Sequence, residues 1–124
     1  MRISRELEMS LGAALNEARR RRHEFVCVEH LLYALLNDSD VSNILRQCGG
    51  DLPGLKSALE AFLDEKIEKL PPKANVEPQH TLGFQRVIQR AAASVQSAGK
   101  EEILSRNVLV ALFREADSLS LIHI

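Results

Sequence analysis

The sequence predicts an all-α domain in which one helical unit occurs twice, the two copies being related by a pseudo-two-fold axis. Three observations support this prediction. Leu, Ala, Glu and Arg dominate the 124 residues, whereas aromatic residues make up only 4% and Trp is absent, which favours helices over a β-sandwich. Apolar residues recur at helical spacing along most of the chain. The second half also repeats the apolar pattern of the first half.

The first unit is predicted to contain four helices and to extend over about residues 3–70. The helices are expected over residues 5–20, 28–36, 41–48 and 51–69. Ser4 and Asp51 are the N-caps of the first and fourth, because their side-chain oxygens can accept free backbone N–H groups of the first turn. Gly49-Gly50 ends the third helix, since left-handed backbone has no steric cost at glycine.

Residues 71–80 are predicted to form an extended surface linker. This stretch contains three of the four prolines and almost no apolar residue, and proline disfavours helix at the residue before it. The second unit is expected over about residues 81–118. Thr81 caps its first helix, over 82–97, and a second helix is expected over 106–116.

The repeat becomes visible when the second half is placed over the first half at an offset of 77 positions, so that Ser4 falls on Thr81. The inward stripes of the two long helices then coincide without a gap: Leu7, Leu11, Ala14 and Ala18 fall on Phe84, Ile88, Ala91 and Val95. Matching caps and matching core stripes at one offset indicate an internal duplication.

The same offset predicts that the second repeat is incomplete. Counterparts of the third and fourth helices would lie near positions 118–125 and 128–146, whereas the sequence has 124 residues. The last six residues, 119–124, match the translation of a sequencing-adaptor end, so we expect them to be a foreign tail. The domain is therefore predicted to span residues 1–118.

Charge and hydropathy exclude several classes of protein. The 16 Lys and Arg residues balance 17 Asp and Glu residues, so there is no basic excess for nucleic-acid binding. No apolar run approaches the ~20 residues of a membrane span, and no signal-peptide core follows Met1. Cys27 and Cys48 form no CxxC pair, and we interpret them as small core residues in a reducing compartment. We therefore expect a cytoplasmic domain without nucleic-acid or membrane partners.

Motifs for catalysis are absent. The six glycines never form the GxxxxGK[ST] loop that binds phosphate, so no ATPase site is expected. The segment His23–Cys27 starts like a zinc-binding HExxH motif, but that motif needs a continuous helix and this segment lies between two helices. We interpret it as a loop that Phe25 and Val26 anchor to the core. A zinc site, in a small hydrolase or metal enzyme, is the competing hypothesis. His30 is interpreted as a hydrogen-bonded structural residue. No catalytic residue, metal ligand or cofactor is predicted in this chain.

Arg19–Arg22 is the strongest run of charge. Cations at a helix C-terminus interact favourably with the carbonyl end of the helix dipole, by about 0.3–1 kcal/mol each, so we interpret the run as a solvated helix end. Contact with a partner protein and nucleic-acid binding are the alternatives. The neighbouring Glu17 and Glu24 dilute the positive charge, which disfavours nucleic acid.

Three segments together carry a specific family resemblance. ELEMSLGAALNEARRRRHEFVCVEHLLYALL, followed by TLGFQRVIQRAAASVQSAGKEEI and NVLVALF, closely resembles the N-terminal domain of the ClpA-type Clp-family AAA+ unfoldases. The resemblance extends from about Ile3 to Ser118. It implies a pseudo-two-fold domain of two four-helix repeats, flexibly tethered above a hexameric ATPase ring that feeds a protease.

The resemblance also implies a non-catalytic function. The domain would dock the adaptor ClpS, which delivers proteins with destabilising N-terminal residues, and would contact protein substrates directly. ATP and Mg²⁺ would bind in other modules of the parent unfoldase, which would also contact the Clp protease. A stand-alone helical protein-binding scaffold is the alternative function.

The adaptor-contact region of the family maps onto His23, Glu24, Thr81, Arg86 and Arg90 of this sequence. Arg86 and Arg90 are four positions apart on one helix, so they share a face. A solvated face is the alternative interpretation of both arginines. Thr81 has the alternative role of an N-cap only.

The sequence departs from the family pattern at two helix starts. Cys27 and Leu104 occupy places where the family usually has Thr, and the loss of a hydroxyl cap costs ~1 kcal/mol. We expect Ser105 to substitute as the cap in the second repeat.

Overall fold

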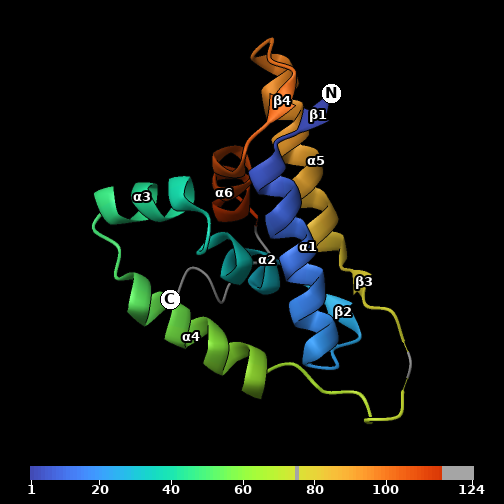
Figure 1. Cartoon of the computed structure of the whole chain (residues 1–124). Coiled ribbons are helices and arrows are strands. Elements are labelled where there is room, and N and C mark those ends of the chain that lie inside the picture. Colours follow the sequence, from blue (N-terminus) through green and yellow to red (C-terminus); the bar gives the residue numbers. More distant parts are fainter. Residues whose placement is uncertain (75, 116–124) are drawn as a thin grey trace.

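The computed structural model describes residues 1–74 and 76–115, and in this part of the chain the predicted all-α architecture is confirmed (Figure 1). The elements, in chain order, are β1 (Arg2–Ile3), α1 (Arg5–Arg20), β2 (Phe25–Val26), α2 (Val28–Leu35), α3 (Ser39–Gln47), α4 (Leu52–Glu65), β3 (Gln79–His80), α5 (Leu82–Ser97), β4 (Glu102–Ile103) and α6 (Ser105–Phe113). None of the helices in the described ranges combines the length and apolar character needed to cross a membrane. The expected tail, 119–124, lies outside the described residues.

The N-caps predicted from the sequence are confirmed. Ser4 Oγ accepts the N–H of Leu7 at 3.1 Å, and Thr81 Oγ1 accepts that of Phe84 at 3.1 Å. Asp51 caps α4 in the same way. Helices α1, α4 and α5 therefore begin where the capping residues predict.

Helix α3 begins at Ser39, two residues earlier than predicted. The Asp38 carboxylate caps it, because Oδ1 accepts two backbone N–H groups of the first turn. The Ser105 hydroxyl donates to Asp38 Oδ2 at 2.6 Å, so the prediction that Ser105 caps α6 is wrong. Asn107 Oδ1 instead accepts the N–H of Leu104 at 2.8 Å at the start of α6.

Helix α4 ends at Glu65, before its predicted end at residue 69. From there the chain returns to the end of α1, where Leu70 N donates to Arg22 O at 2.8 Å and His23 forms an antiparallel bridge with Lys69. These contacts require extended backbone, which excludes a longer helix. Helix α6 also ends earlier than predicted, at residue 113 rather than 116.

Two short parallel strand pairs join the repeats, and the sequence did not predict them. β1 pairs with β4, and β2 pairs with β3. The two pairs correspond at the offset of 77, because Arg2 opposes Glu102 as Gln79 opposes Phe25. Each repeat therefore contributes its first strand to a pair with the other repeat, as a pseudo-two-fold axis requires. The predicted linker is accordingly shorter and ends at the buried Pro78.

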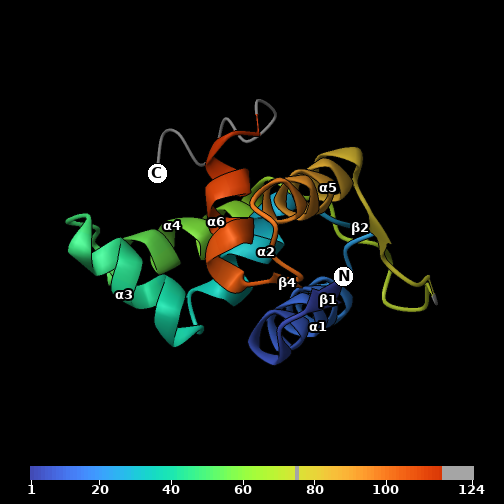
Figure 2. The same cartoon turned by 90° about the horizontal axis from the view of Figure 1, so that it is seen from above.

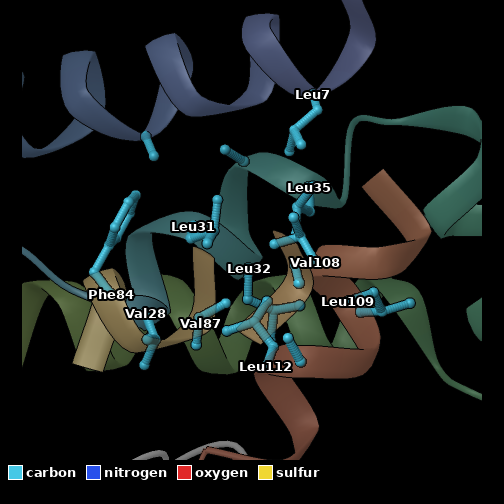
Figure 3. Close-up of a cluster of buried hydrophobic side chains, with 14 of the residues drawn as sticks. Leu7, Val28, Leu31, Leu32, Leu35, Phe84, Val87, Val108, Leu109 and Leu112 are labelled. Carbon is cyan, nitrogen blue, oxygen red and sulfur yellow. The ribbon is translucent and has the colours of Figure 1, made fainter. Parts of the chain in front are cut away.

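Helix α2 lies at the centre of the fold, with α1, α4, α5 and α6 around it (Figure 1, Figure 2). Most of α2 is buried. Figure 3 shows Leu31, Leu32 and Leu35 of α2 between α1, Phe84 of α5 and Leu112 of α6. One continuous core therefore connects both repeats and fixes the relative positions of the helix ends.

Cys48 is exposed at the end of α3, so its interpretation as a core residue is wrong. Its spacing from Val41 and Ile44 suggested an inward face. Helix α3 lies at the edge of the molecule, however, and its last turn extends beyond the core (Figure 1). Cys27 is half-buried.

The turn after α1 is strained in the first repeat only. Arg22 has a φ of 59°, in the left-handed region, which costs a residue with a side chain roughly 1–2 kcal/mol. Its counterpart in the second repeat is Gly99, whose φ is 74°. The two turns have the same shape, but only the second has the residue that adopts it without strain.

Replacing Arg22 with Gly is expected to raise the free energy of unfolding by about 0.5–1 kcal/mol, because glycine relieves this strain. Urea denaturation followed by circular dichroism measures the change. Arg20→Gly, in the last turn of α1, is the matched control and is expected to lower the free energy of unfolding by about 1 kcal/mol. A loss of stability in Arg22→Gly would contradict the strain.

Candidate functional site

Two predicted site residues, Glu24 and Thr81, flank the strand pair β2–β3, Glu24 just before β2 and Thr81 just after β3. Gln79 N donates to Glu24 O at 3.0 Å, and Thr81 N donates to Val26 O at 3.1 Å. The Glu24 side chain is exposed, whereas Thr81 is half-buried. The Thr81 hydroxyl caps α5, so a Thr81 variant would disturb the helix start as well as any contact made there.

Arg86 and Arg90 both extend from α5 to the C-terminal end of α6. Arg86 Nη2 lies 3.0 Å from Glu115 Oε1, and Arg86 Nε lies 3.2 Å from the same oxygen. Arg90 Nη1 donates to the backbone O of Arg114 at 2.8 Å. The prediction that Arg86 and Arg90 share one face of their helix is confirmed. The alternative interpretation as a solvated face is incomplete for Arg86, because its guanidinium pairs with the carboxylate of Glu115, which is only 4% exposed.

Gly83 lies between Thr81 and Arg86. A Cβ atom built on Gly83 would lie 3.9 Å from Thr81 Oγ1, from Arg86 Nη2 and from a methyl group of Val28. The start of α5 therefore packs against the buried Val28 at the start of α2. The sequence did not reveal this link to α2, because Val28 is separated from Arg86 by most of the first repeat.

The fifth predicted residue, His23, is buried. Its side chain is 1% exposed, and His23 Nδ1 lies 2.8 Å from His30 Nε2. His30 Nδ1 accepts the N–H of Cys27 at 3.0 Å, which places the proton of His30 on Nε2 and makes His23 Nδ1 the acceptor. The structural role expected for His30 is confirmed. The His23 ring cannot touch another protein in this arrangement, which corrects the expectation of direct contact.

Burial keeps both imidazoles neutral near pH 7. It lowers the pKa of His30 to about 4, with a smaller contribution from His23. The pKa of His23 is also lowered, first by burial and then by the positive charges of Arg21 and Lys69. The hydrogen bond between these two neutral rings therefore helps to hold the backbone that carries Glu24.

The segment from His23 to Cys27 does not have the geometry of an HExxH motif, because β2 lies within it. Burial raises the pKa of the Cys27 thiol to about 12, which disfavours the thiolate that zinc binds. Within residues 1–74 and 76–115, no three His, Cys, Asp or Glu side chains are grouped as metal ligands. Val26 is buried as expected, but Phe25 is 46% exposed, so the expectation that Phe25 anchors the core is wrong.

The arginine run at the end of α1 is not a uniformly solvated helix end. Arg21 is only 8% exposed. Its Nε lies 2.7 Å from Glu17 Oε1, and its guanidinium also pairs with Asp64 of α4 and lies 6.0 Å from the Tyr33 ring centroid. Arg21 therefore ties α1 to α4. The sequence-based interpretation is wrong for this residue, because long-range ion pairs leave no periodic pattern.

A groove of about 500 Å³ lies between α1 and α5. It is lined by Leu11, Gly12, Leu15, His80, Phe84, Gln85, Ile88 and Gln89. The His80 ring packs against Phe84 with ring centroids 4.5 Å apart. Leu11 and Ile88 belong to the stripes that predicted the core, yet both are only partly buried and line this groove. A single sequence stripe does not distinguish a core from an apolar groove.

Comparison with known proteins identifies the family. Residues 2–121 match the sequence profile of the Clp repeat (R) N-terminal domain. A ClpA homolog protein from Fuscovulum blasticum is 44% identical over 117 residues, which represent 94% of this chain and 15% of that protein. The chain thus spans only a small part of the length of this relative.

Solved structures share the fold. The Hsp104 N-terminal domain from Candida albicans has a TM-score of 0.84 at 13% identity, with 94% of this chain and 77% of that chain covered. A ClpV N-domain in complex with a VipB peptide has a TM-score of 0.79 at 23% identity, with coverage of 98% and 76%. At these identities the structural likeness shows the fold alone. The profile match over nearly the whole sequence and the 44% identical relative go further, and they show that the chain belongs to the Clp repeat N-terminal domain family.

Proposed function

We propose that this chain is the docking domain of a Clp-family unfoldase and that it holds a ClpS-type adaptor on the surface formed by Glu24, Thr81, Arg86 and Arg90. The observation that supports this site best is the β2–β3 pair, which holds the backbone of the exposed Glu24 beside Gln79, two residues before Thr81. The exposed Phe25 lies next to Glu24 and offers an aromatic anchor. Charges of both signs around such an anchor favour a specific orientation of a docked protein.

His23 would contribute to this surface indirectly, because its ring is buried. Its ring cannot reach the adaptor, but its hydrogen bond to His30 and the bridge to Lys69 hold the backbone that carries Glu24. A variant of His23 is therefore expected to weaken docking by moving Glu24 rather than by removing a contact.

The second part of the proposed function is that the groove between α1 and α5 binds protein substrates. Its apolar floor and the amide rim of Gln85 and Gln89 suit an uncharged, apolar segment of a protein substrate. The ClpV N-domain that shares this fold binds a VipB peptide, which supports peptide recognition as a property of the architecture. Brief contacts with such segments would hold substrates near the unfoldase.

In this proposal the parent protein acts in the cytoplasm, and its ATP- and Mg²⁺-binding modules and its contact with the Clp protease lie in regions other than the one described here. Several copies of the domain on one ring would raise the local concentration of bound cargo, so weak individual contacts would suffice. An open reading frame that continues past residue 118 into a Walker motif would support the unfoldase, and a genuine stop there would support the scaffold alternative.

Titration of the chain with a purified ClpS-type adaptor by calorimetry tests the proposal. The double variant Glu24→Lys with Arg86→Glu keeps the net charge and is expected to weaken docking about tenfold or more, because two oriented charge contacts become repulsive. Far-ultraviolet circular dichroism checks that both proteins contain the same amount of helix.

A second double variant serves as the matched control. Glu65→Lys with Arg46→Glu makes the same pair of charge reversals at exposed positions on α4 and α3, and it is expected to keep the wild-type affinity. Failure of the folded wild-type chain to bind the adaptor would refute the adaptor function. Equal affinity of wild type and the Glu24/Arg86 variant would remove these residues from the docking surface.

A further inference from the structure

Gly12 lies in the middle of α1 and lines the groove between α1 and α5. Glycine in a helix interior lowers stability relative to alanine, because it loses more backbone freedom on folding. Neither packing nor backbone conformation requires glycine at this position. Apart from its chain neighbours and its own helix backbone, a Cβ atom built on Gly12 would meet no atom within 4 Å. Gly12 is also not one of the described residues that have a positive φ.

The second repeat has a large side chain at the equivalent position. At the offset of 77, Gly12 corresponds to Gln89 of α5, and Leu11 corresponds to Ile88. All four residues line the groove, so the pseudo-two-fold axis places equivalent positions of the two helices on its two walls. The fold therefore accepts a long side chain at this helix position. The α5 wall carries an amide there, whereas the α1 wall carries no side chain.

The α1 wall is apolar around Gly12. Leu11 and Leu15 are four positions apart and Gly12 is three positions from Leu15, so the three residues share one helix face. Both leucines are partly buried, and Gly12 is exposed. We call the unfilled space at Gly12, beside Leu11 and Leu15, the Gly12 notch.

The chemistry of the groove favours an uncharged occupant. None of the described residues that line it is Asp, Glu, Lys or Arg, so a charged side chain would lose hydration there without gaining an ion pair. An aromatic ring or a leucine side chain would instead bury apolar area and would need no hydrogen bond. The amide of Gln89 on the opposite wall can bind a backbone N–H or C=O group of the same segment.

We propose that Gly12 determines which side chains the groove accepts, because the Gly12 notch receives one bulky, uncharged side chain, Phe or Leu, of a protein substrate. This inference rests on the proposed function of the groove and adds to it a specificity-determining residue and a class of side chain. A substitution that fills the notch is therefore expected to stabilise the domain and to weaken binding. A substitution that damages the fold would lower both stability and binding.

Nuclear magnetic resonance titration of the ¹⁵N-labelled chain with two capped decapeptides tests the proposal. Both peptides consist of Ser and Gln, except that one has Phe and the other has Ala at the two central positions. We expect the Phe peptide to bind about tenfold more tightly than the Ala peptide, with shift changes at the groove. Gly12→Leu is expected to bind the Phe peptide about tenfold more weakly and to change the affinity for the Ala peptide by less than about twofold.

Two variants are the matched controls. Gly12→Ala adds only a methyl group, and it is expected to raise the Tm by about 3–5 °C and to keep the affinity for the Phe peptide within about twofold. Gly12→Leu is expected to raise the Tm nearly as much, because leucine is also a strong helix former. Ala93→Leu adds a leucine at an exposed position of α5 that does not line the groove, and it is expected to keep the wild-type affinity.

Several outcomes would overturn the role of Gly12 and retain the groove as a binding site. These are wild-type affinity of Gly12→Leu for the Phe peptide, equal weakening by Gly12→Ala and Gly12→Leu, equal affinity of the wild type for both peptides, or a lower Tm for Gly12→Leu. Failure of the folded wild-type chain to bind either peptide, or shift changes away from the groove, would refute substrate binding in the groove itself. The inference would then fall together with that part of the proposed function.

Discussion

Leu31→Ala is expected to lower the free energy of unfolding by about 3–4 kcal/mol. Leu31 is fully buried on α2, between α1 and the helices of the second repeat (Figure 3). Truncation leaves a cavity that cannot collapse, because the surrounding helices are held by one another and by two strand pairs. Urea denaturation followed by circular dichroism measures the loss at pH 7.5.

Leu82→Ala is the matched control for this prediction. The Leu82 side chain is 71% exposed on the first turn of α5, so the same truncation is expected to change the free energy of unfolding by less than about 0.5 kcal/mol. A loss below about 1 kcal/mol for Leu31→Ala would contradict the central position of α2 in the core.

Acidification from pH 7.5 to pH 5 is expected to lower the free energy of unfolding by about 2 kcal/mol through His30 alone. The folded-state pKa of His30 is about 4, below its ordinary value of 6.5, because the ring is buried. The unfolded chain therefore binds more protons between pH 6.5 and pH 4. Stability is fully present above pH 6.5 and decreases as the pH falls through this window. The lowered pKa of His23 acts in the same direction.

The variant His30→Asn isolates this contribution. Asn107 occupies the equivalent position in the second repeat and accepts the N–H of Leu104, so Asn is expected to keep the hydrogen bond to Cys27 N. Its loss of packing lowers stability at pH 7.5, but the slope of stability against pH between 5 and 6.5 is expected to fall by about one proton. His80→Asn, at an exposed histidine, is the control. A wild-type slope in His30→Asn would contradict the pKa of His30.

At lower pH the carboxylate of Glu17 adds a second loss. Burial by itself would raise the pKa of Glu17, but hydrogen bonds from Arg20 and Arg21 outweigh burial and lower it. Its contribution to stability is therefore present above about pH 4.5 and is lost below that value. As the pH falls, the histidine pair is therefore destabilised first, and the ion pairs that hold α1 against α4 are destabilised at lower pH.

The six helices and the starting points of α1, α4 and α5 were predictable because their causes are local. A hydroxyl or carboxylate at an N-cap and an apolar stripe at helical spacing lie within a few residues of each other, as at Ser4 and Thr81. The duplication was predictable for a related reason, since two local patterns recur at one offset. Glu24, Thr81, Arg86 and Arg90 followed from the family resemblance, and their docking role stays a prediction.

The remaining features depend on pairs of residues far apart in the chain. Strands of two residues carry no periodicity, so β1 to β4 could not be recognised. The buried Arg21 pairs with Asp64 of α4, and the buried His23 forms a bridge with Lys69 of the segment after α4. Composition at these positions resembles that of a solvated helix end or an exposed loop. The groove was missed because its lining residues also fit a core stripe.

The β1–β4 pair has a consequence for how the domain is made. It joins Arg2 to Glu102, so about 100 residues must be added after the first strand before its partner is synthesised. Until α5 and α6 leave the ribosome, the apolar surface of α2 and one strand edge remain uncovered. Nascent chains of this domain are therefore most exposed to aggregation and to proteases just before translation of β4, and folding of the first half is completed by the second.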